Sequence, residues 1–248
     1  MSRVLLVIPC FKESQRLPGF LGDLCEALRA ANLAVDVLAV DDGSGTSEAT
    51  FLAESIGRLR PVHPFLLKPL LLERNRGKGG AVYAGWDTAG DDHEWLAFVD
   101  ADGAISAAEV VRGLGSVAET APEAMFAVRS GEGNTEVRRT RIRRLTGWVF
   151  AILVKILFDL PVPDTQCGFK MVPRAWYFEH RAKFIEERFC FDIELAYWLV
   201  RAGVKIRVVP ISWEEAPGSH LGFSHVTHMF GSLLVLRRRF SRREERSY

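Results

Sequence analysis

The sequence predicts an α/β fold in which one mostly parallel β-sheet is flanked by helices. Short apolar runs rich in valine, leucine and isoleucine alternate with segments whose apolar residues recur every three or four positions. The first pattern is typical of buried strands in a parallel sheet, and the second is typical of amphipathic helices. The chain of 248 residues is long enough for one large α/β domain with a sizeable core.

The first half of the chain shows the clearest alternation of strand and helix. Valine- and leucine-rich runs bounded by polar turns predict the strands. Apolar residues at steps of three and four predict the first helix, and a glycine-rich turn opens the third. We expect strands at residues 3–9, 35–40, 66–75 and 94–99, and helices at residues 17–28, 47–57 and 78–89.

The second half is less regular and ends in a basic amphipathic segment. We expect a basic helix at about residues 138–158, a loop at residues 161–170, a helix at residues 189–203 and a strand at residues 204–213. We divide the chain into one domain at residues 1–222 and a C-terminal amphipathic basic helix or tail at residues 223–248. The longest apolar run, residues 145–158, contains Lys155 and is shorter than the roughly 20 residues of a spanning helix. We therefore expect no transmembrane segment, while attachment to a membrane surface stays open.

The composition excludes some classes of partner and site. The 32 basic and 31 acidic residues nearly balance, so no overall charge favours nucleic acid. Four widely spaced cysteines, without a C-x-x-C pair, suggest neither a zinc site nor a disulfide framework. A reducing cytoplasm is the compartment that fits them. These cysteines are Cys10, Cys25, Cys167 and Cys190.

Three polar motifs follow predicted strands at the point where each strand ends. They are PCFKES at residues 9–14, VDDGSG at residues 40–45 and DADG at residues 100–103. In open α/β sheets, ligands bind outside the carboxyl ends of the strands. The three motifs are therefore expected to form one site.

The DADG motif places two carboxylates, Asp100 and Asp102, at the end of a buried strand. Carboxylate oxygens suit Mg²⁺ or Mn²⁺, and Mg²⁺ is commonly held by one or two carboxylates together with substrate phosphates. The alternative is an ordinary turn, because aspartate and glycine are favoured there. The position beside VDDGSG favours the metal and diphosphate interpretation.

Two further motifs suit a nucleotide. Asp41 or Asp42 is placed to hydrogen-bond a base or a ribose hydroxyl, although a turn and a helix cap explain these residues equally well. The run NRGKGG, residues 75–80, offers backbone N–H groups and the Lys78 ammonium just before a helix. Such a setting suits phosphate, but the glycines also fit a flexible turn.

Arginines gather ahead of the apolar run in the second half of the chain. A basic segment followed by aromatic and aliphatic residues suggests an interfacial helix on anionic lipid, with some arginines available to a phosphate. A solvated helix end followed by a core helix is the alternative. The arginines are Arg129, Arg138, Arg139, Arg141, Arg143 and Arg144.

The motif FDIEL contains two acids, Asp192 and Glu194, in a predicted apolar helix. Burial of one acid would raise its pKa and suit it to act as a general base. Alternatively, acids are favoured at a helix N-terminus by the helix dipole.

Taken together, the motifs resemble those of family 2 glycosyltransferases with the GT-A fold. VIPCFKE, AVDDGS, NRGKGGAV, FVDADG, DTQCGFK, FDIEL and ISWEEAPGSHL occur in the family's order and approximate spacing, over about residues 4–221. They are most similar to the branch that glycosylates dolichyl and other polyprenyl phosphates. The resemblance implies a single GT-A domain, a Rossmann-like mostly parallel sheet flanked by helices, with amphipathic helices in the C-terminal half.

The resemblance also implies roles for individual residues. Residues matching the donor nucleotide-sugar site are Pro9, Phe11, Glu13, Asp41, Asp42, Lys78, Asp100 and Asp102, of which Asp102 and Asp100 match the metal ligands. Residues matching the acceptor phosphate site are Arg129, Arg139, Arg143 and Lys170. Asp164 lies in the loop that the family places beside the donor sugar, and Asp192 matches the catalytic base.

The implied activity is that of an inverting glycosyltransferase. It would move a hexose from a UDP-glucose- or GDP-mannose-type donor to a polyprenyl or dolichyl phosphate, with Mg²⁺ or Mn²⁺ as cofactor. The protein would be cytoplasmic and peripheral at the inner face of the cytoplasmic membrane, with no nucleic-acid partner. An acceptor hydroxyl on a soluble or cell-envelope glycan is the alternative, and a nucleotide-sugar-binding protein without catalysis is another.

The acceptor decides what Asp192 must do. A phosphate monoester is already ionised near neutral pH, because its second pKa is about 6. Such an acceptor needs no base, and Asp192 would then position or stabilise. A hydroxyl acceptor requires Asp192 as the base.

Overall fold

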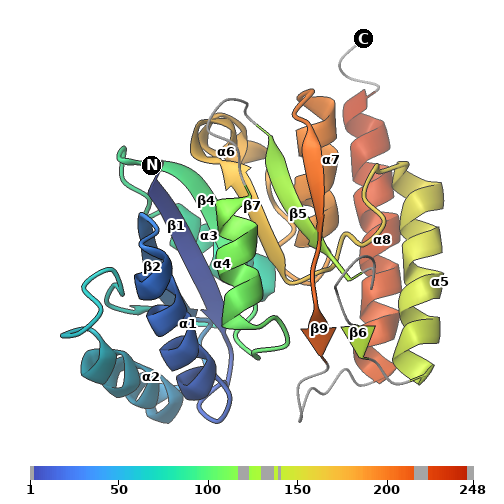
Figure 1. The fold of residues 1–248 in the computed structure, drawn as a ribbon. Helices are drawn as coiled ribbons and strands as arrows, with labels where there is room; N and C mark the ends of the chain where they lie inside the picture. The colour runs from blue at the N-terminus through green and yellow to red at the C-terminus, as the bar shows by residue number, and fades with distance from the viewer. Residues whose placement is uncertain (1–2, 117–122, 130–136, 139–140, 215–222, 245–248) are drawn as a thin grey trace.

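A seven-stranded sheet forms the centre of the molecule. The computed structural model describes residues 3–116, 123–129, 137–138, 141–214 and 223–244. In these residues the strand order is β3-β2-β1-β4-β7-β5-β8 (Figure 1). The strands are β1 (Arg3–Cys10), β2 (Val35–Asp41), β3 (Leu70–Leu71), β4 (His93–Val99), β5 (Ala124–Val128), β7 (Phe169–Pro173) and β8 (Ile206–Pro210). A two-stranded sheet pairs β6 (Val137–Arg138) with β9 (Trp213–Glu214).

The pairing confirms the predicted mostly parallel sheet. Strands β3, β2, β1 and β4 pair in parallel, as do β5 and β8. Strand β7 lies between β4 and β5 and is antiparallel to both. Because it runs the other way, β7 begins at the edge of the sheet where β4 and β5 end.

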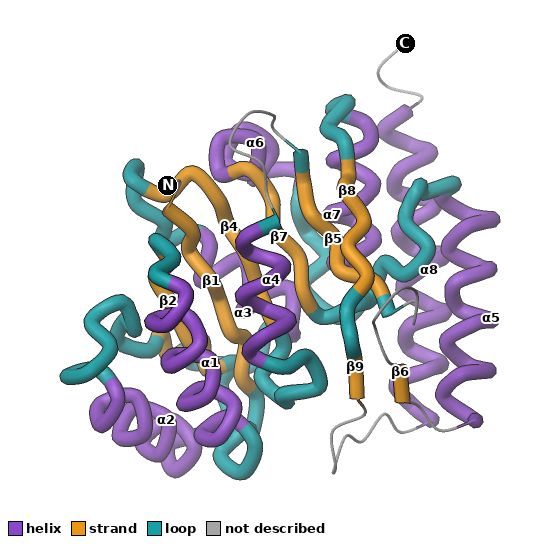
Figure 2. The backbone as a smooth tube through the Cα atoms, in the orientation of Figure 1, coloured by secondary structure: helices purple, strands orange, loops and turns teal. Residues whose placement is uncertain are grey.

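Helices cover both faces of the sheet, so its strands are buried on both sides (Figure 2). Helices α1 (Leu17–Ala31), α2 (Thr46–Leu59) and α4 (Ala107–Gly115) contribute side chains to the core on one face. The other face is covered by α3 (Lys78–Trp86), α5 (Arg141–Phe158), α6 (Arg174–His180), α7 (Phe191–Arg201) and α8 (Phe223–Glu244), with a short 3-10 helix at Arg181–Lys183.

The C-terminal helix α8 packs on the same core as α7. Leu233, Leu236 and Phe240 of α8 are buried, and the Phe240 ring stacks on Tyr197 with ring centroids 3.7 Å apart. Helix α8 also lies beside α5 in both ribbon views. Among the described residues, we find no helix with the length and apolar character that crossing a bilayer requires.

Some elements differ from those expected from the sequence. The strand expected at residues 66–75 is only the two residues of β3, and Pro69 just before it has no N–H for a sheet ladder. Strand β7 was not predicted, because Lys170 at its second position breaks the apolar pattern. Helix α5 begins at Arg141, and α4, α6 and β5 were not predicted.

Candidate active site

The predicted site residues gather at the carboxyl edge of the sheet. Asp41 ends β2, Asp100 follows β4 and Arg129 follows β5. The start of β7 meets the same edge, since Phe169 pairs with Val99 at the end of β4. The antiparallel direction of β7 therefore brings the DTQCGFK motif next to the DADG motif.

Asp100 forms the centre of this edge. Its carboxylate lies 2.7 Å from the Lys78 ammonium, and its backbone N–H donates to the Gly168 carbonyl at 2.9 Å. A Cβ atom at Gly168 would overlap the Asp100 carboxylate. A side chain at this position would therefore have to displace the Asp100 carboxylate. Gly168 belongs to the DTQCGFK motif, but no role for it was predicted from the sequence.

Asp102 lies two residues further along the turn. Its carboxylate accepts a hydrogen bond from the Ala104 N–H at 3.0 Å. Burial, together with repulsion from the Asp100 carboxylate, raises the pKa of Asp102. Burial likewise raises the pKa of Glu13, and its pairing with Arg16 opposes the shift. Repulsion from the Asp102 and Asp100 carboxylates raises this pKa further.

This cluster of carboxylates fits a divalent cation. A cation between Asp100 and Asp102 would offset the repulsion that raises the pKa of Asp102. Within the described ranges, no group of three or more histidine, cysteine, aspartate or glutamate side chains is arranged to hold a metal ion by itself. Two carboxylates completed by diphosphate oxygens and water match the coordination that Mg²⁺ commonly takes.

Lys78 is the first residue of α3 and is held between a carboxylate and two rings. Its ammonium lies 5.1 Å from the ring centroid of Phe98 and 5.8 Å from that of Phe191. Burial favours the neutral amine, but attraction to Asp100, Asp192 and Asp102 outweighs it and raises the pKa of Lys78. The side chain therefore presents a fixed positive charge beside the DADG motif.

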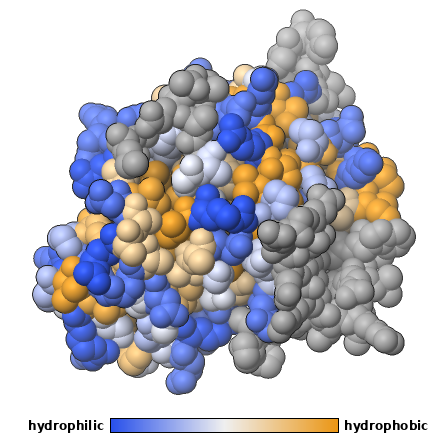
Figure 3. Space-filling model, in the orientation of Figure 1, coloured by the Kyte–Doolittle hydropathy of each residue, from blue (hydrophilic) through white to orange (hydrophobic). Residues whose placement is uncertain are grey.

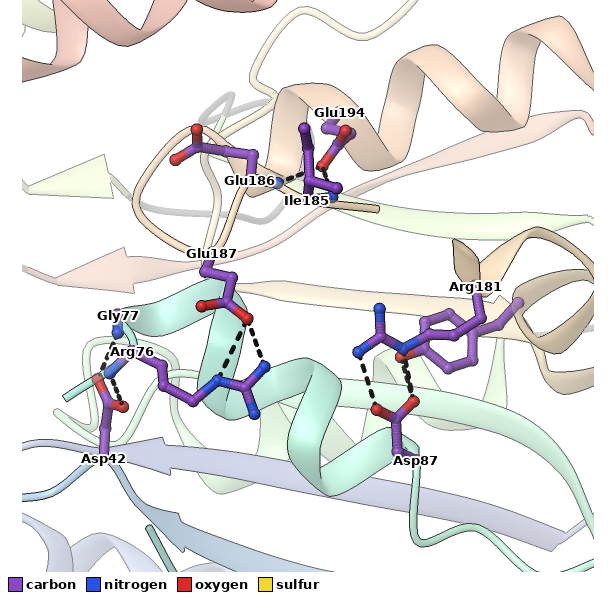
Figure 4. A network of polar contacts seen from close by, with 10 residues as sticks. Asp42, Arg76, Gly77, Asp87, Arg181, Ile185, Glu186, Glu187 and Glu194 are labelled. Carbon is purple, nitrogen blue, oxygen red and sulfur yellow. Dashed lines mark hydrogen bonds and ion pairs between the residues drawn. The ribbon is translucent and has the colours of Figure 1, made fainter. Parts of the chain in front are cut away.

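Asp42 holds the glycine-rich loop in place. Its carboxylate accepts the backbone N–H groups of Arg76 at 2.7 Å and Gly77 at 2.8 Å (Figure 4). Gly77 has a φ of 94°, which glycine adopts without strain. Both Asp42 carboxylate oxygens thus accept hydrogen bonds from the loop backbone. Asp41 accepts the Ser44 N–H at 3.0 Å, so both acids shape the turns around the site.

The opening segment lies beside a pocket. Phe11 is exposed, whereas Pro9 is half-buried. Glu13 pairs with Arg16, with Arg16 Nε donating at 2.8 Å. The pocket is lined by residues from the first two strand ends and from α1 and α2: Cys10, Glu13, Ser14, Leu17, Pro18, Leu21, Asp41, Glu48, Phe51, Leu52 and Ser55.

Asp192 and Lys170 lie below this surface as a buried pair. The Lys170 ammonium is 2.6 Å from Asp192 Oδ1 and donates to the Cys167 carbonyl at 2.6 Å. Lys170 has no exposed surface and Asp192 is 2% exposed. Burial raises the pKa of Asp192, although Lys170 and Lys78 oppose the shift. The structure therefore places Lys170 against Asp192 and away from the surface at which we expected it to meet an acceptor phosphate.

Arg129 and Asp164 also form a pair. The guanidinium donates from Nε and Nη2 to the two Asp164 oxygens, at 2.6 and 2.7 Å. Its carbon lies 5.4 Å from the ring centroid of Trp213. Of the other expected phosphate-binding arginines, Arg139 lies outside the described residues. Arg143 lies in α5, and its side chain is also outside them.

Comparison with known proteins identifies the family. The family model described as glycosyl transferase family 2 matches residues 5–180. This chain is a family 2 glycosyltransferase. The family expected from the motifs is thereby confirmed, as is the expectation that the chain is an enzyme that transfers a sugar.

Curated relatives of this family 2 glycosyltransferase match it over nearly its whole length. The human dolichyl-phosphate beta-glucosyltransferase is 30% identical over 255 residues, which cover 96% of this chain and 76% of the relative. The enzyme of the same name from Dictyostelium discoideum is 28% identical over 247 residues, covering 95% of this chain and 74% of the relative.

Solved structures confirm the GT-A-like fold of this glycosyltransferase. The mannosyltransferase PcManGT from Pyrobaculum calidifontis, in complex with GDP-Man and Mn²⁺, has a TM-score of 0.65 at 16% identity. The match covers 97% of this chain and 64% of that one. Glucosyl-3-phosphoglycerate synthase from Mycobacterium tuberculosis, in complex with Mn²⁺, UDP-glucose and phosphoglyceric acid, has a TM-score of 0.67 at 15% identity and covers 95% of this chain and 79% of that one.

Proposed function

We propose that this glycosyltransferase moves glucose from UDP-glucose to a polyprenyl phosphate, with inversion at the anomeric carbon. The observation that carries the proposal is the match to dolichyl-phosphate beta-glucosyltransferases over about nine tenths of the chain or more. The Lys78–Asp100 pair and the neighbouring Asp102 supply the charges that a nucleotide diphosphate needs. The pocket beside Asp41 lies at the first two strand ends, on the edge at which open α/β sheets bind their ligands.

Asp102 and Asp100 would hold a divalent metal, Mg²⁺ or Mn²⁺. When bound there, the cation would neutralise charge that builds on the departing diphosphate. Lys78 adds a second fixed positive charge, and its contacts with Phe98 and Phe191 restrict its movement. Asp42 fixes the loop that carries Lys78.

Arg129 is the residue of the described chain best placed to receive the acceptor phosphate. A guanidinium binds phosphate and carboxylate with the same two-pronged geometry. The acceptor phosphate would therefore compete with the Asp164 carboxylate for the Arg129 guanidinium. Trp213 stays stacked on the guanidinium and keeps its plane oriented. Arg143 is proposed as a second contact from α5.

With this acceptor, Asp192 has a positioning role. A phosphate monoester near neutral pH needs no base, and Asp192 is only 2% exposed. Lys170 instead holds the Asp192 carboxylate in place. The negative charge of Asp192 helps to keep Lys78 protonated. Asp164 keeps Arg129 oriented until the acceptor arrives.

The surface of α5 and α8 is proposed to rest on the inner face of the cytoplasmic membrane. Ile156 is 72% exposed, and Leu234 and Val235 are 57% and 64% exposed. Apolar residues reach the surface over the upper end of α5 in Figure 3. The exposed cations Lys155 and Arg238 lie on the same two helices. Apolar groups next to cations are typical of a helix on anionic lipid.

A phase-partition assay tests the proposed activity. Purified protein is incubated with Mg²⁺ or Mn²⁺, a polyprenyl phosphate and radiolabelled UDP-glucose, and label is counted in the organic layer. Metal-dependent label from UDP-glucose, and none from GDP-mannose, is the expected result. Label that stays in the aqueous layer with every donor would contradict the lipid acceptor and turn the search to hydroxyl acceptors.

A further inference from the structure

A buried carboxylate anchors the segment that packs on the glycine-rich loop. Glu194 of α7 has no exposed surface. One of its oxygens accepts the backbone N–H groups of Ile185 at 3.0 Å and Glu186 at 2.7 Å (Figure 4). Two backbone N–H groups and a charged partner are what a carboxylate needs to stay ionised when it is buried. Glu194 therefore fixes the backbone at residues 185–186.

The other oxygen of Glu194 binds the C-terminal helix. Arg239 of α8 donates to it at 2.9 Å and also donates to the Lys183 carbonyl at 2.9 Å. Ser232 lies two turns earlier on α8 and hydrogen-bonds Cys190. Helix α8 thus forms hydrogen bonds with both ends of the segment at residues 183–190.

The same segment packs directly on the glycine-rich loop. The Glu187 carbonyl accepts the Gly80 N–H at 2.8 Å, and the Glu187 carboxylate accepts from Arg76. A Cβ atom at Gly77 would lie 2.6 Å from the Glu187 carbonyl oxygen, and one at Gly79 would lie 2.5 Å from Phe191 Cβ. Because the two segments are in direct contact, a shift of residues 186–191 would be transmitted to the loop.

We infer that Glu194 and Arg239 are positioning residues for the donor site: they couple α8, through the segment at residues 183–190, to the loop that carries Lys78. The inference rests on the proposed function in that Lys78 is taken to meet the donor diphosphate. The coupling passes from Arg239 to the Glu194 carboxylate, then to the backbone of residues 185–187, and from there to the Gly80 N–H. A helix with an exposed apolar face then sets the geometry of a site on the sheet edge.

The substitution Arg239→Gln tests the coupling at its α8 end, where the side chain is part-buried, whereas Glu194 is fully buried. Arg237→Gln is the matched control, because Arg237 is exposed on the same helix and carries the same charge. Arg239→Lys keeps a cation for Glu194 but has fewer donors to reach Lys183 as well, so its effect should be intermediate.

The first readout is amide hydrogen exchange in protein without ligand. Arg239→Gln should speed exchange at Gly80 by about tenfold, within the range typical of coupling between sites. Arg237→Gln should leave it unchanged, and in Arg239→Gln the increase at Gly80 should exceed any increase in β1 and β4. Unchanged exchange at Gly80 in Arg239→Gln overturns the inference, whatever the protein binds.

The second readout is binding of UDP in the presence of Mn²⁺, measured by calorimetry. The dissociation constant should rise about tenfold in Arg239→Gln and stay at the wild-type value in Arg237→Gln. The KM for the donor should rise while the KM for polyprenyl phosphate is unchanged. Wild-type protein that binds neither UDP nor GDP would count against the proposed function, whereas equal UDP binding by wild type and Arg239→Gln would count against the coupling.

A double-mutant cycle with Glu194→Gln identifies the pathway. If both residues act through one contact, the double variant should be no worse than the more impaired single variant. Additive effects on Gly80 exchange would show that Arg239 acts by another route. Should Glu194→Gln not fold, the Arg239 variants still decide the question.

Discussion

The ammonium of Lys170 lies 2.6 Å from the carboxylate of Asp192 in the interior of the protein. One partner comes from β7 and the other from α7, so the pair joins the sheet to the helix above it. The ring centroids of Phe98 and Phe126 lie 5.2 and 5.1 Å from the same ammonium. A lysine expected at an acceptor phosphate is thus the counter-charge of the residue expected to be the base.

Removing one member of this pair should destabilise the protein. Asp192→Asn leaves the Lys170 charge buried without its partner, and the free energy of unfolding should fall by about 3–5 kcal/mol. The double variant Lys170→Met with Asp192→Leu should lose less, because no charge stays buried. Urea unfolding of the single and double variants measures both values. A single variant as stable as wild type would show that the pair is not formed in solution.

Asp102→Asn should abolish sugar transfer. An amide cannot replace the charge of a carboxylate toward a divalent cation, and Asp100 alone then faces the diphosphate. Transfer to polyprenyl phosphate and Mn²⁺ affinity are measured together. Asp23→Asn serves as the control, since Asp23 is exposed on α1. Full transfer by Asp102→Asn with metal present would remove Asp102 from the metal site.

Gly168→Ala should impair metal binding through a steric clash. The new methyl group would overlap the Asp100 carboxylate and force it away from the Lys78 ammonium. Gly57→Ala is a matched control. Gly57 lies in helix α2, and a methyl group added there would have no other atom within 4 Å. Gly57→Ala should stabilise the protein by about 0.5–1 kcal/mol. Mn²⁺ titration and thermal unfolding follow the two effects, and equal Mn²⁺ affinity in both variants would contradict the first.

Arg129→Lys should weaken binding of the acceptor while the donor is bound as before. Lysine lacks the two-pronged geometry and the stacking on Trp213. Loss of one charge-assisted hydrogen bond costs about 1.5–3 kcal/mol, which should appear in the KM for polyprenyl phosphate. Steady-state kinetics with each substrate varied in turn provides the measurement. An equal rise in both KM values would place Arg129 elsewhere in the mechanism.

The stability of the protein should depend on pH through Glu194. Burial raises the pKa of Glu194, although the Glu186 N–H, Arg239 and the Ile185 N–H oppose the shift. Between the unfolded value of about 4.3 and the raised value, the native state holds a proton that the unfolded chain releases, so stability falls as the pH rises. The stability of the wild type relative to Glu194→Gln should therefore decline upward from pH 4.3. Unfolding measured at several pH values gives the difference, and an opposite slope would show a lowered pKa.

The fold class could be predicted from local sequence patterns, and the polar motifs indicated one edge of the sheet as a candidate site. Apolar patterns placed β1, β2, β4 and α1, because strands buried on both faces and amphipathic helices leave local patterns. The polar motifs at Asp41 and Asp100 followed strands, and parallel strands bring their carboxyl ends to one edge. The motifs as a set indicated the family.

The pairing of the buried charges depends on how distant elements pack and could not be predicted from local sequence. The pairing of Lys170 with Asp192 depends on the antiparallel direction of β7, and a strand carrying a buried lysine leaves no apolar pattern to read. The contact between Glu194 and Arg239 joins residues 45 positions apart on two helices. Local sequence reports burial and periodicity, whereas the partner of a buried charge is fixed by how distant elements pack.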